Sequence, residues 1–150
     1  GTAIREGVIY TSDQAHHCVL KSAKLAGILP DRVRAIPCDE HYRMPLAPLR
    51  AAIAEDRARG LRPFAVVGNA GTTNTGTVDP LDALADLAAE QGLWFHVDGA
   101  YGGWGVLDDR VRDRYGDLAT YDSFAIDPHK WLAAPVGTGA AIVVSSGVIA

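Results

Sequence analysis

Residues 79–98, with the sequence DPLDALADLAAEQGLWFHVD, contain a helix signal followed directly by a strand signal. Asp79 is placed to cap the helix, Pro80 suits its first position, and Gly92 suits its end. Apolar side chains at helical spacing predict one buried stripe, formed by Leu81, Leu84, Ala85, Leu87 and Ala88. The run 93–98 is mostly apolar, as is typical of a strand covered on both faces. This stretch predicts one helix–strand unit of an α/β fold.

The same alternation extends in both directions along the chain. Strands are expected at 8–11, 33–37, 64–68, 123–126 and 140–144, and helices at 12–26, 46–59 and 108–118. Ser12 suits the start of the first helix and Gly27 its end, and Gly60 suits the end of the second. Alternating strands and helices predict a doubly wound α/β fold, in which ligands bind at the carboxyl ends of the strands.

The composition excludes several classes of protein. The 150 residues carry a formal net charge of −4, which disfavours nucleic acid as a partner because phosphate binding needs a basic face. No apolar run approaches the roughly 20 residues of a membrane helix, and the chain does not open with a signal peptide. Two cysteines are too few for a disulfide scaffold. We therefore expect a cytoplasmic protein without a membrane or nucleic-acid partner.

The ends of the sequence indicate a longer protein. Met44 is the only methionine, and strand-like runs begin almost at once and recur near the end. We therefore expect this chain to be one part of a larger molecule.

Polar residues follow four of the predicted strands. His16 comes after the first strand, the run 71–73 (Gly-Thr-Thr) after the third, Asp98 ends the fourth, and Lys130 follows the fifth. The carboxyl ends of parallel strands lie on one edge of a sheet. We therefore expect these residues to meet there.

Asp98 occupies a position where a carboxylate is costly unless a cation or hydrogen-bond donors face it. A helix cap or a salt bridge to arginine would satisfy it. The residues that follow, Gly-Ala-Tyr-Gly-Gly at 99–103, instead favour a ligand, because they would let a flat group approach the backbone closely. A flat cation beside a carboxylate describes a protonated pyridine ring.

Lys130 directly follows an apolar strand, although most lysines are solvated surface residues. In apolar surroundings the amine can lose its proton and attack a carbonyl to form a Schiff base. Such a lysine, together with an aspartate that holds a pyridinium nitrogen, is the arrangement used by pyridoxal 5′-phosphate (PLP) enzymes. His16 would then stack on the cofactor ring, and a half-buried structural histidine is the equally compatible alternative.

Four motifs occur in order along the chain: SDQAH at 12–16, GTT at 71–73, HVDGAYGG at 96–103 and DPHKWL at 127–132. Together they resemble the PLP-dependent group II amino-acid decarboxylases, the family of aromatic-L-amino-acid, glutamate and histidine decarboxylases. The resemblance covers essentially the whole chain. It implies the fold-type I large domain, a three-layer α/β fold with a mostly parallel sheet and helices on both faces. Residues 1–150 would be part of this PLP-binding domain, without its N-terminal phosphate cup, the mobile loop and the C-terminal small domain.

The resemblance also implies roles for three catalytic residues. Lys130 would form the Schiff base with the cofactor. Asp98 would pair with the pyridinium nitrogen and keep the ring protonated. His16 would stack on one face of the ring.

Four further residues would contact the cofactor in such a family member. Ala100 would pack against the second ring face, and Thr73 would lie near the ring hydroxyl or the substrate carboxylate. His129 and Asp127 would lie near the phosphate. Asp127 departs from the aromatic-amino-acid decarboxylases, which typically have Asn there. A charged Asp cannot donate to a phosphate and would repel it, so either its backbone makes the contact or its side chain faces away.

The resemblance implies a carboxy-lyase that converts an L-amino acid to its amine and CO2. An aromatic substrate is favoured over glutamate, because glutamate enzymes tend to have Ser-Gly-His-Lys where this chain has DPHK at 127–130. The alternatives are decarboxylation of glutamate or another non-aromatic amino acid, and another PLP reaction of an aminotransferase, aldolase or desulfurase. The family is dimeric, so a homodimer with exposed apolar surface on this chain is expected. This chain alone is expected to be catalytically incomplete.

Other kinds of site are disfavoured. A zinc site can be imagined from His16, His17, Cys18, Cys38 and His41, but their spacing matches none of the usual zinc patterns, and we expect no metal. A nucleotide-binding module would need a Gly-x-Gly-x-x-Gly or Gly-x-x-x-x-Gly-Lys-Ser/Thr motif, and a serine hydrolase would need Gly-x-Ser-x-Gly. The sequence contains none of these motifs.

Overall fold

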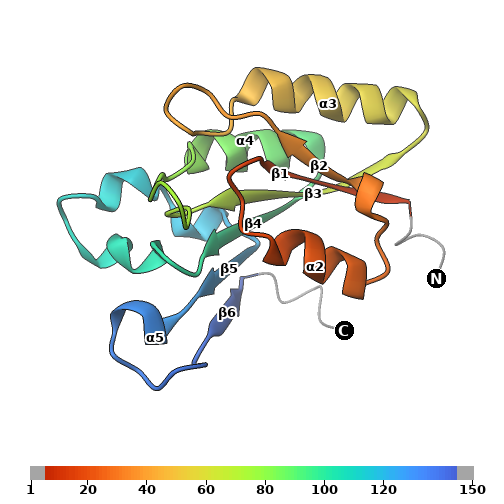
Figure 1. The fold of residues 1–150 in the computed structure, drawn as a ribbon. Helices are drawn as coiled ribbons and strands as arrows, with labels where there is room; N and C mark the ends of the chain where they lie inside the picture. Colours follow the sequence, from red (N-terminus) through yellow and green to blue (C-terminus); the bar gives the residue numbers. More distant parts are fainter. Residues whose placement is uncertain (1–5, 145–150) are drawn as a thin grey trace.

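The structure is a computed structural model that describes residues 6–144 (Figure 1). The strands are β1 (Gly7–Ser12), β2 (Val33–Ile36), β3 (Arg62–Asn69), β4 (Trp94–Gly99), β5 (Ser123–Ile126) and β6 (Ala140–Val143). The α-helices are α2 (Cys18–Leu25), α3 (Leu46–Ala58), α4 (Leu81–Gln91) and α5 (Pro128–Trp131). Short 3-10 turns lie at Pro30–Arg32, Gly103–Leu107, Arg112–Arg114 and Leu118–Thr120.

The six strands form one sheet in the order β2-β1-β3-β4-β5-β6. The pairs from β2 to β5 are parallel, and β6 pairs with β5 in the antiparallel direction. The predicted mostly parallel sheet is therefore confirmed. The strand order reverses between β1 and β3, and the crevice at their carboxyl ends is where doubly wound sheets bind ligands.

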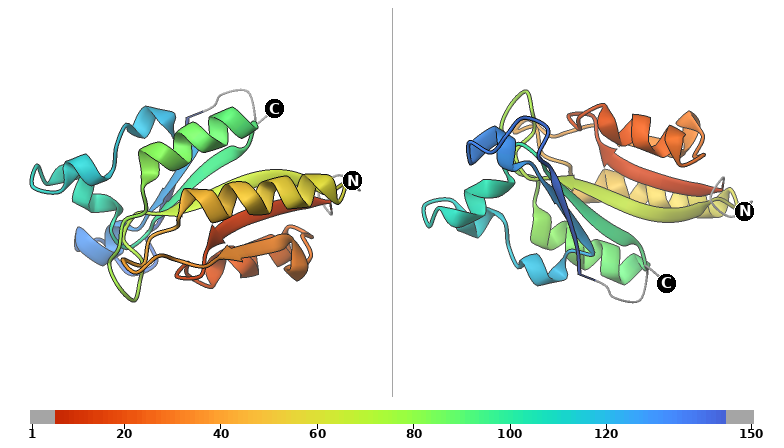
Figure 2. Two further views of the ribbon diagram at one scale, coloured as in Figure 1. Left: turned by 90° about the horizontal axis from the view of Figure 1, so that it is seen from above. Right: turned by 90° about the horizontal axis from the view of Figure 1, so that it is seen from below.

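Helices cover both faces of the sheet, as predicted (Figure 2). Helix α2 lies on one face, and α3 and α4 lie on the other. The core under α3 and α4 is made by alternate strand residues such as Tyr10, Val66 and Phe95, and by the predicted stripe of α4, all of them buried. The opposite face of β4 and β5 is only partly covered, and it carries the polar side chains of the site.

The first helix begins later than predicted. Ser12 is not a cap but the last residue of β1, in register with Ile36 of β2. Its hydroxyl accepts a hydrogen bond from Asn69 Nδ2 at 3.1 Å, and α2 starts only at Cys18. His16 therefore lies in the loop between β1 and α2 rather than in a helical turn. Sheet pairing thus prevails over a local capping signal.

Asp79 does not cap α4, which is a second correction. Its carboxylate is 2% exposed and accepts hydrogen bonds from the backbone N–H of Met44 and of Asn69, both at 2.8 Å. Pro80 occupies the N-cap position without a side-chain hydrogen bond. The segment 108–118 also differs from its prediction, because it forms separate 3-10 turns instead of one helix.

A partly buried ion pair joins β2 to α3. Arg34 Nε lies 2.9 Å from Asp56 Oδ2, and the Tyr10 hydroxyl donates to the same oxygen at 3.0 Å. The Arg34 hydrogen bonds hold the pKa of Asp56 below its usual value, against the opposing effect of burial. None of the helices within residues 6–144 is long and apolar enough to cross a membrane.

Candidate functional site

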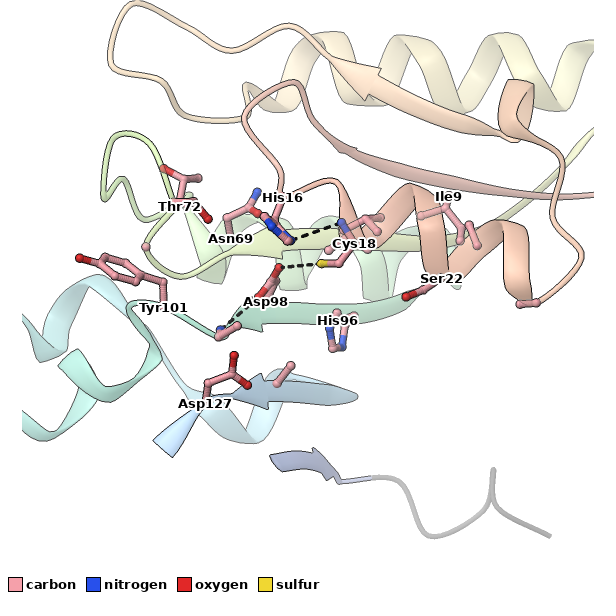
Figure 3. Close-up of a pocket in the computed structure, with 18 of the residues that line it drawn as sticks. Ile9, His16, Cys18, Ser22, Asn69, Thr72, His96, Asp98, Tyr101 and Asp127 are labelled. Atoms are coloured by element: carbon pink, nitrogen blue, oxygen red, sulfur yellow. Dashed lines mark hydrogen bonds between the residues drawn. The ribbon is translucent and has the colours of Figure 1, made fainter. Parts of the chain in front are cut away.

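A pocket of about 590 Å³ opens at the carboxyl ends of the strands, between the sheet and α2 (Figure 3). Its walls come from β1 and the loop after it, from α2 and the segment that follows, from β3, β4 and the loops after them, and from β5 and α5. Six of the seven predicted site residues line it: His16, Thr73, Asp98, Ala100, Asp127 and Lys130. The carboxyl edge of the sheet therefore gathers residues that are up to 114 positions apart in the chain, from His16 to Lys130, as predicted.

Asp98 lies at the end of β4 and is partly buried. Its Oδ1 accepts a hydrogen bond from Ala100 N at 3.0 Å, and its Oδ2 lies 3.9 Å from Cys18 Sγ. Burial, and then the charge of Asp98, raise the pKa of the Cys18 thiol, so the thiol keeps its proton and acts as the donor. Two donors therefore orient a carboxylate that faces the pocket (Figure 3).

Lys130 lies on α5, a single turn that follows β5. Its Nζ is 2.8 Å from Asp127 Oδ2, and the two side chains are 36% and 23% exposed. The expected apolar surroundings are not found, since Trp131 is 53% and Leu132 is 51% exposed. An acidic partner, not desolvation, is the main feature of the environment of this amine.

His16 lies at the mouth of the pocket, on an exposed stretch of the loop after β1. Its Nδ1 accepts a hydrogen bond from Cys18 N at 3.3 Å, which fixes the orientation of the ring. The ring also contacts that of His17, with a centroid distance of 4.0 Å and a tilt of 42°. The backbone at the start of α2 thus positions both His16 and the Cys18 thiol.

Glycines at the ends of β3 and β4 pack closely against neighbouring residues. A Cβ at Gly71, whose φ is +86°, would lie 2.6 Å from the Gly102 Cα, so the two loops touch through these residues. A Cβ at Gly99 would lie 2.3 Å from the Phe124 ring. Of residues 99–103, only Ala100 and Tyr101 line the pocket.

His129 is the one predicted site residue that does not line the pocket. Its Nδ1 is 2.7 Å from the Thr138 backbone oxygen, so one ring nitrogen is engaged by the loop before β6. Within residues 6–144, no group of three or more His, Cys, Asp or Glu side chains is arranged to hold a metal ion.

Sequence reasoning missed Asn69 and His96, which also line the pocket. Asn69 is in register with Asp98 on the neighbouring strand, and His96 lies two residues before Asp98 and so on the same face. His96 Nδ1 is 2.7 Å from Ser123 Oγ, and burial lowers the pKa of this imidazole. The period-two pattern of strands, applied backwards from Asp98, would have found His96.

Comparison with known proteins gives a consistent result. Residues 3–149 match the family model described as pyridoxal-dependent decarboxylase conserved domain. The chain is 39% identical to the aromatic-L-amino-acid decarboxylase of Bacillus atrophaeus, over 95% of this chain and 30% of that protein. It is 44% identical to the L-2,4-diaminobutyrate decarboxylase of Rhizobium meliloti, over 91% and 28%, respectively.

A solved structure agrees with these relatives. The crystal structure of Catharanthus roseus tryptophan decarboxylase in complex with L-tryptophan matches with a TM-score of 0.90 and 35% identity. The match covers 95% of this chain and 31% of that one. The chain thus spans about 30% of the length of the proteins it matches. The fold, the pocket at the strand ends and these matches agree that this chain belongs to the pyridoxal-dependent decarboxylase family.

Proposed function

We propose that the protein is a PLP-dependent carboxy-lyase that converts an aromatic L-amino acid to its amine and CO2. The observation that carries this proposal is the meeting of Asp98 and Lys130 in one pocket, from the ends of the adjacent strands β4 and β5. Membership of the decarboxylase family supports the reaction type. This chain would form part of the PLP-binding large domain.

The residues of the pocket fit PLP. A volume of about 590 Å³ is in the range of cofactor sites. The donor set offers a carboxylate, Asp98, suited to a protonated ring nitrogen, and an amine, Lys130, suited to an aldehyde. When bound, PLP supplies that aldehyde and a ring that accepts the electron pair of the breaking bond.

Each of the three catalytic residues would contribute a separate property. Asp98, oriented by Ala100 N and the Cys18 thiol, would hold a proton at the ring nitrogen. Lys130 would supply the amine that binds the cofactor and that the substrate amine replaces. His16, fixed by its bond to Cys18 N, would cover one face of the ring and exclude water from it.

Four other residues complete the proposed site. Thr73 and Ala100 line the pocket and would contact the ring or the substrate carboxylate. Asp127 and His129 precede Lys130 and remain the proposed neighbours of the phosphate. Only Asp127 of these two lines the pocket.

The substrate and the assembly extend the proposal. The 39% identity to an aromatic-L-amino-acid decarboxylase supports an aromatic substrate, and the 44% identity to an L-2,4-diaminobutyrate decarboxylase makes that amino acid the second candidate. We also propose a cytoplasmic homodimer. Exposed apolar side chains on the last strand, Ile142 and Val143, at 48% and 41%, fit an assembly or domain contact.

Product analysis tests the reaction. The full-length protein is incubated with PLP and with L-tryptophan, L-tyrosine, L-2,4-diaminobutyrate or L-glutamate, and amine and CO2 are quantified. We expect equal amounts of both from an aromatic amino acid. Lys130→Ala should abolish turnover, whereas Lys24→Ala, at an exposed position on α2, should retain it. A keto acid as the product would contradict decarboxylation, and turnover by Lys130→Ala would contradict the site.

A further inference from the structure

The ion pair between Lys130 and Asp127 lies inside the pocket. Lys130 Nζ is 2.8 Å from Asp127 Oδ2, and both side chains belong to the pocket lining. The residues are three positions apart on one helical turn, so the pair forms within a single short element. Asp127 is also the residue at which the sequence departs from the resemblance.

Asp127 is held from several sides. Its backbone oxygen accepts hydrogen bonds from Trp104 Nε1 at 3.2 Å and from Lys130 N at 3.1 Å. A Cβ at Gly139 would lie 3.0 Å from Asp127 Oδ1, so the loop before β6 closes over the carboxylate. The carboxylate therefore has a defined place beside the Lys130 amine.

An ion pair of this kind opposes nucleophilic attack. A paired ammonium group has no free lone pair and must give up a proton and its carboxylate partner before it can react. The proton passes to solvent, and the neutral amine attacks the aldehyde carbon. A C=N bond then replaces the C=O bond, and the two remaining amine protons leave with the aldehyde oxygen as water. Breaking the ion pair therefore adds to the free-energy barrier for the reaction of Lys130 with an aldehyde.

We propose that Asp127 is a positioning residue that holds the Lys130 ammonium in an ion pair and thereby slows the uptake of the cofactor aldehyde. This inference rests on the proposed function, because it assumes that Lys130 is the residue that reacts. In this proposal, the Asp127 carboxylate acts by pairing with the Lys130 amine. The competing explanation is that Asp127 slows uptake by repelling the cofactor phosphate.

Two aldehydes separate these explanations. PLP carries a phosphate, and pyridine-4-carboxaldehyde has the pyridine ring and aldehyde without it. The full-length protein is mixed with either aldehyde, reduced with borohydride at timed intervals, and digested. Borohydride adds hydride to the C=N carbon and makes the adduct permanent. Mass spectrometry then gives the rate of labelling of the peptide that contains Lys130.

Another ion pair and two exposed lysines of the same chain serve as controls. Asp109→Asn removes the carboxylate of another ion pair with the same spacing, in which Arg112 Nη1 lies 3.6 Å from Asp109 Oδ1 and neither residue lines the pocket. Lys21 and Lys24, exposed on α2, report general reactivity in the same digest. A general change in amine reactivity would alter labelling at these lysines as well as at Lys130.

We expect Asp127→Asn to label Lys130 roughly two- to fivefold faster with both aldehydes, as for the loss of a partly exposed ion pair. Asp109→Asn should leave the rate unchanged. Added KCl should accelerate labelling of the wild type by the uncharged aldehyde, because salt weakens the pair, but not of Asp127→Asn. This salt response tests the proposal even if Asp127→Asn does not fold.

Three results would overturn the inference. An unchanged or slower rate with both aldehydes would show that the pair does not restrain the amine. A faster rate with PLP alone would assign the effect to phosphate repulsion. Wild-type labelling that does not respond to salt would also contradict the pair. If Lys130 were not labelled in the wild type by either aldehyde, the proposed function itself would fail.

Discussion

Asp79 ties three separate segments of the fold together, and its replacement should be costly. One carboxylate oxygen accepts from Met44 N at 2.8 Å, and the other accepts from Asn69 N at 2.8 Å and Asn69 Nδ2 at 2.9 Å. Asn69 lies beside Asp98 in the sheet register. The network therefore joins the segment before α3, the end of β3 and the start of α4 directly behind the pocket.

The cost of Asp79→Ala follows from the groups left without an acceptor. Two buried backbone N–H groups lose their partner, at about 1–3 kcal/mol each. The Asn69 side-chain amide would still donate a hydrogen bond to Ser12 Oγ at 3.1 Å, so it adds little to the loss of stability. Removing a buried carboxylate also removes the cost of its desolvation. We therefore expect the free energy of unfolding to fall by about 3 kcal/mol, in the lower half of the range for the two N–H groups together. For a chain of this size, that corresponds to a melting temperature roughly 6–12 °C lower.

The assay is urea unfolding followed by far-ultraviolet circular dichroism. Asp86→Ala is the matched control, because Asp86 is an exposed aspartate on the same helix, α4, and should change stability by no more than about 0.5 kcal/mol. An Asp79→Ala variant within 0.5 kcal/mol of the wild type would refute this reasoning.

A pH series adds an independent check. Burial is the largest influence on Asp79 and raises its pKa above 3.8, so the folded chain binds this proton more tightly than the unfolded chain. The contribution of Asp79 to stability is therefore largest in acid and falls as the pH rises through the folded pKa. The stability difference between the wild type and Asp79→Asn should shrink accordingly between acid and neutral pH.

Three further predictions concern the site and its support. Asp98→Ala should lower kcat about 100-fold or more at saturating PLP, since nothing would hold the ring proton, and a steady-state assay with unchanged kcat would exclude the proposed role. Arg34→Met should cost about 2–3 kcal/mol at neutral pH, because the buried Asp56 carboxylate would lose its closest cation and keep only Arg59, whose Nη1 lies 3.9 Å from Asp56 Oδ1. Because Arg34 lowers the pKa of Asp56, this wild-type advantage should be present above pH 3.8 and disappear as the pH falls through the folded pKa, as urea titrations at several pH values would show. Gly71→Ala should lower the melting temperature more than Gly76→Ala, because both have positive φ but only Gly71 would place its Cβ against the other loop, 2.6 Å from the Gly102 Cα; equal shifts would contradict the contact.

The sequence predicted the order and kind of most elements because their signals are local. The stripe on α4 is visible from helical spacing alone, and all five of its residues are buried. The strands were also located, because continuous apolar runs between helices are typical of a parallel sheet. Because the carboxyl ends of parallel strands lie on one edge of the sheet, the same pattern predicted that Asp98 and Lys130 lie close together, although it says nothing about their contacts.

The local partners of the site residues could not be predicted in this way. Ser12 and Asp79 are both residue types that commonly cap helices. In the structure, both instead bond to the side chain of Asn69, and Asp79 also accepts a hydrogen bond from Met44 N. The glycines after β4 suggested room for a flat ligand. In the structure, the loop after β3 and the Phe124 ring occupy the space beside Gly102 and Gly99.

The sequence by itself determined the α/β architecture, the edge of the sheet where the site lies and the residue types gathered there. Only the tertiary structure decided which of these residues touch: Asp98 with the Cys18 thiol, and Lys130 with Asp127 instead of apolar neighbours. The physical reason is that periodicity and capping depend on a few adjacent residues. Contacts across the pocket depend on strand register and loop packing, which no local segment specifies.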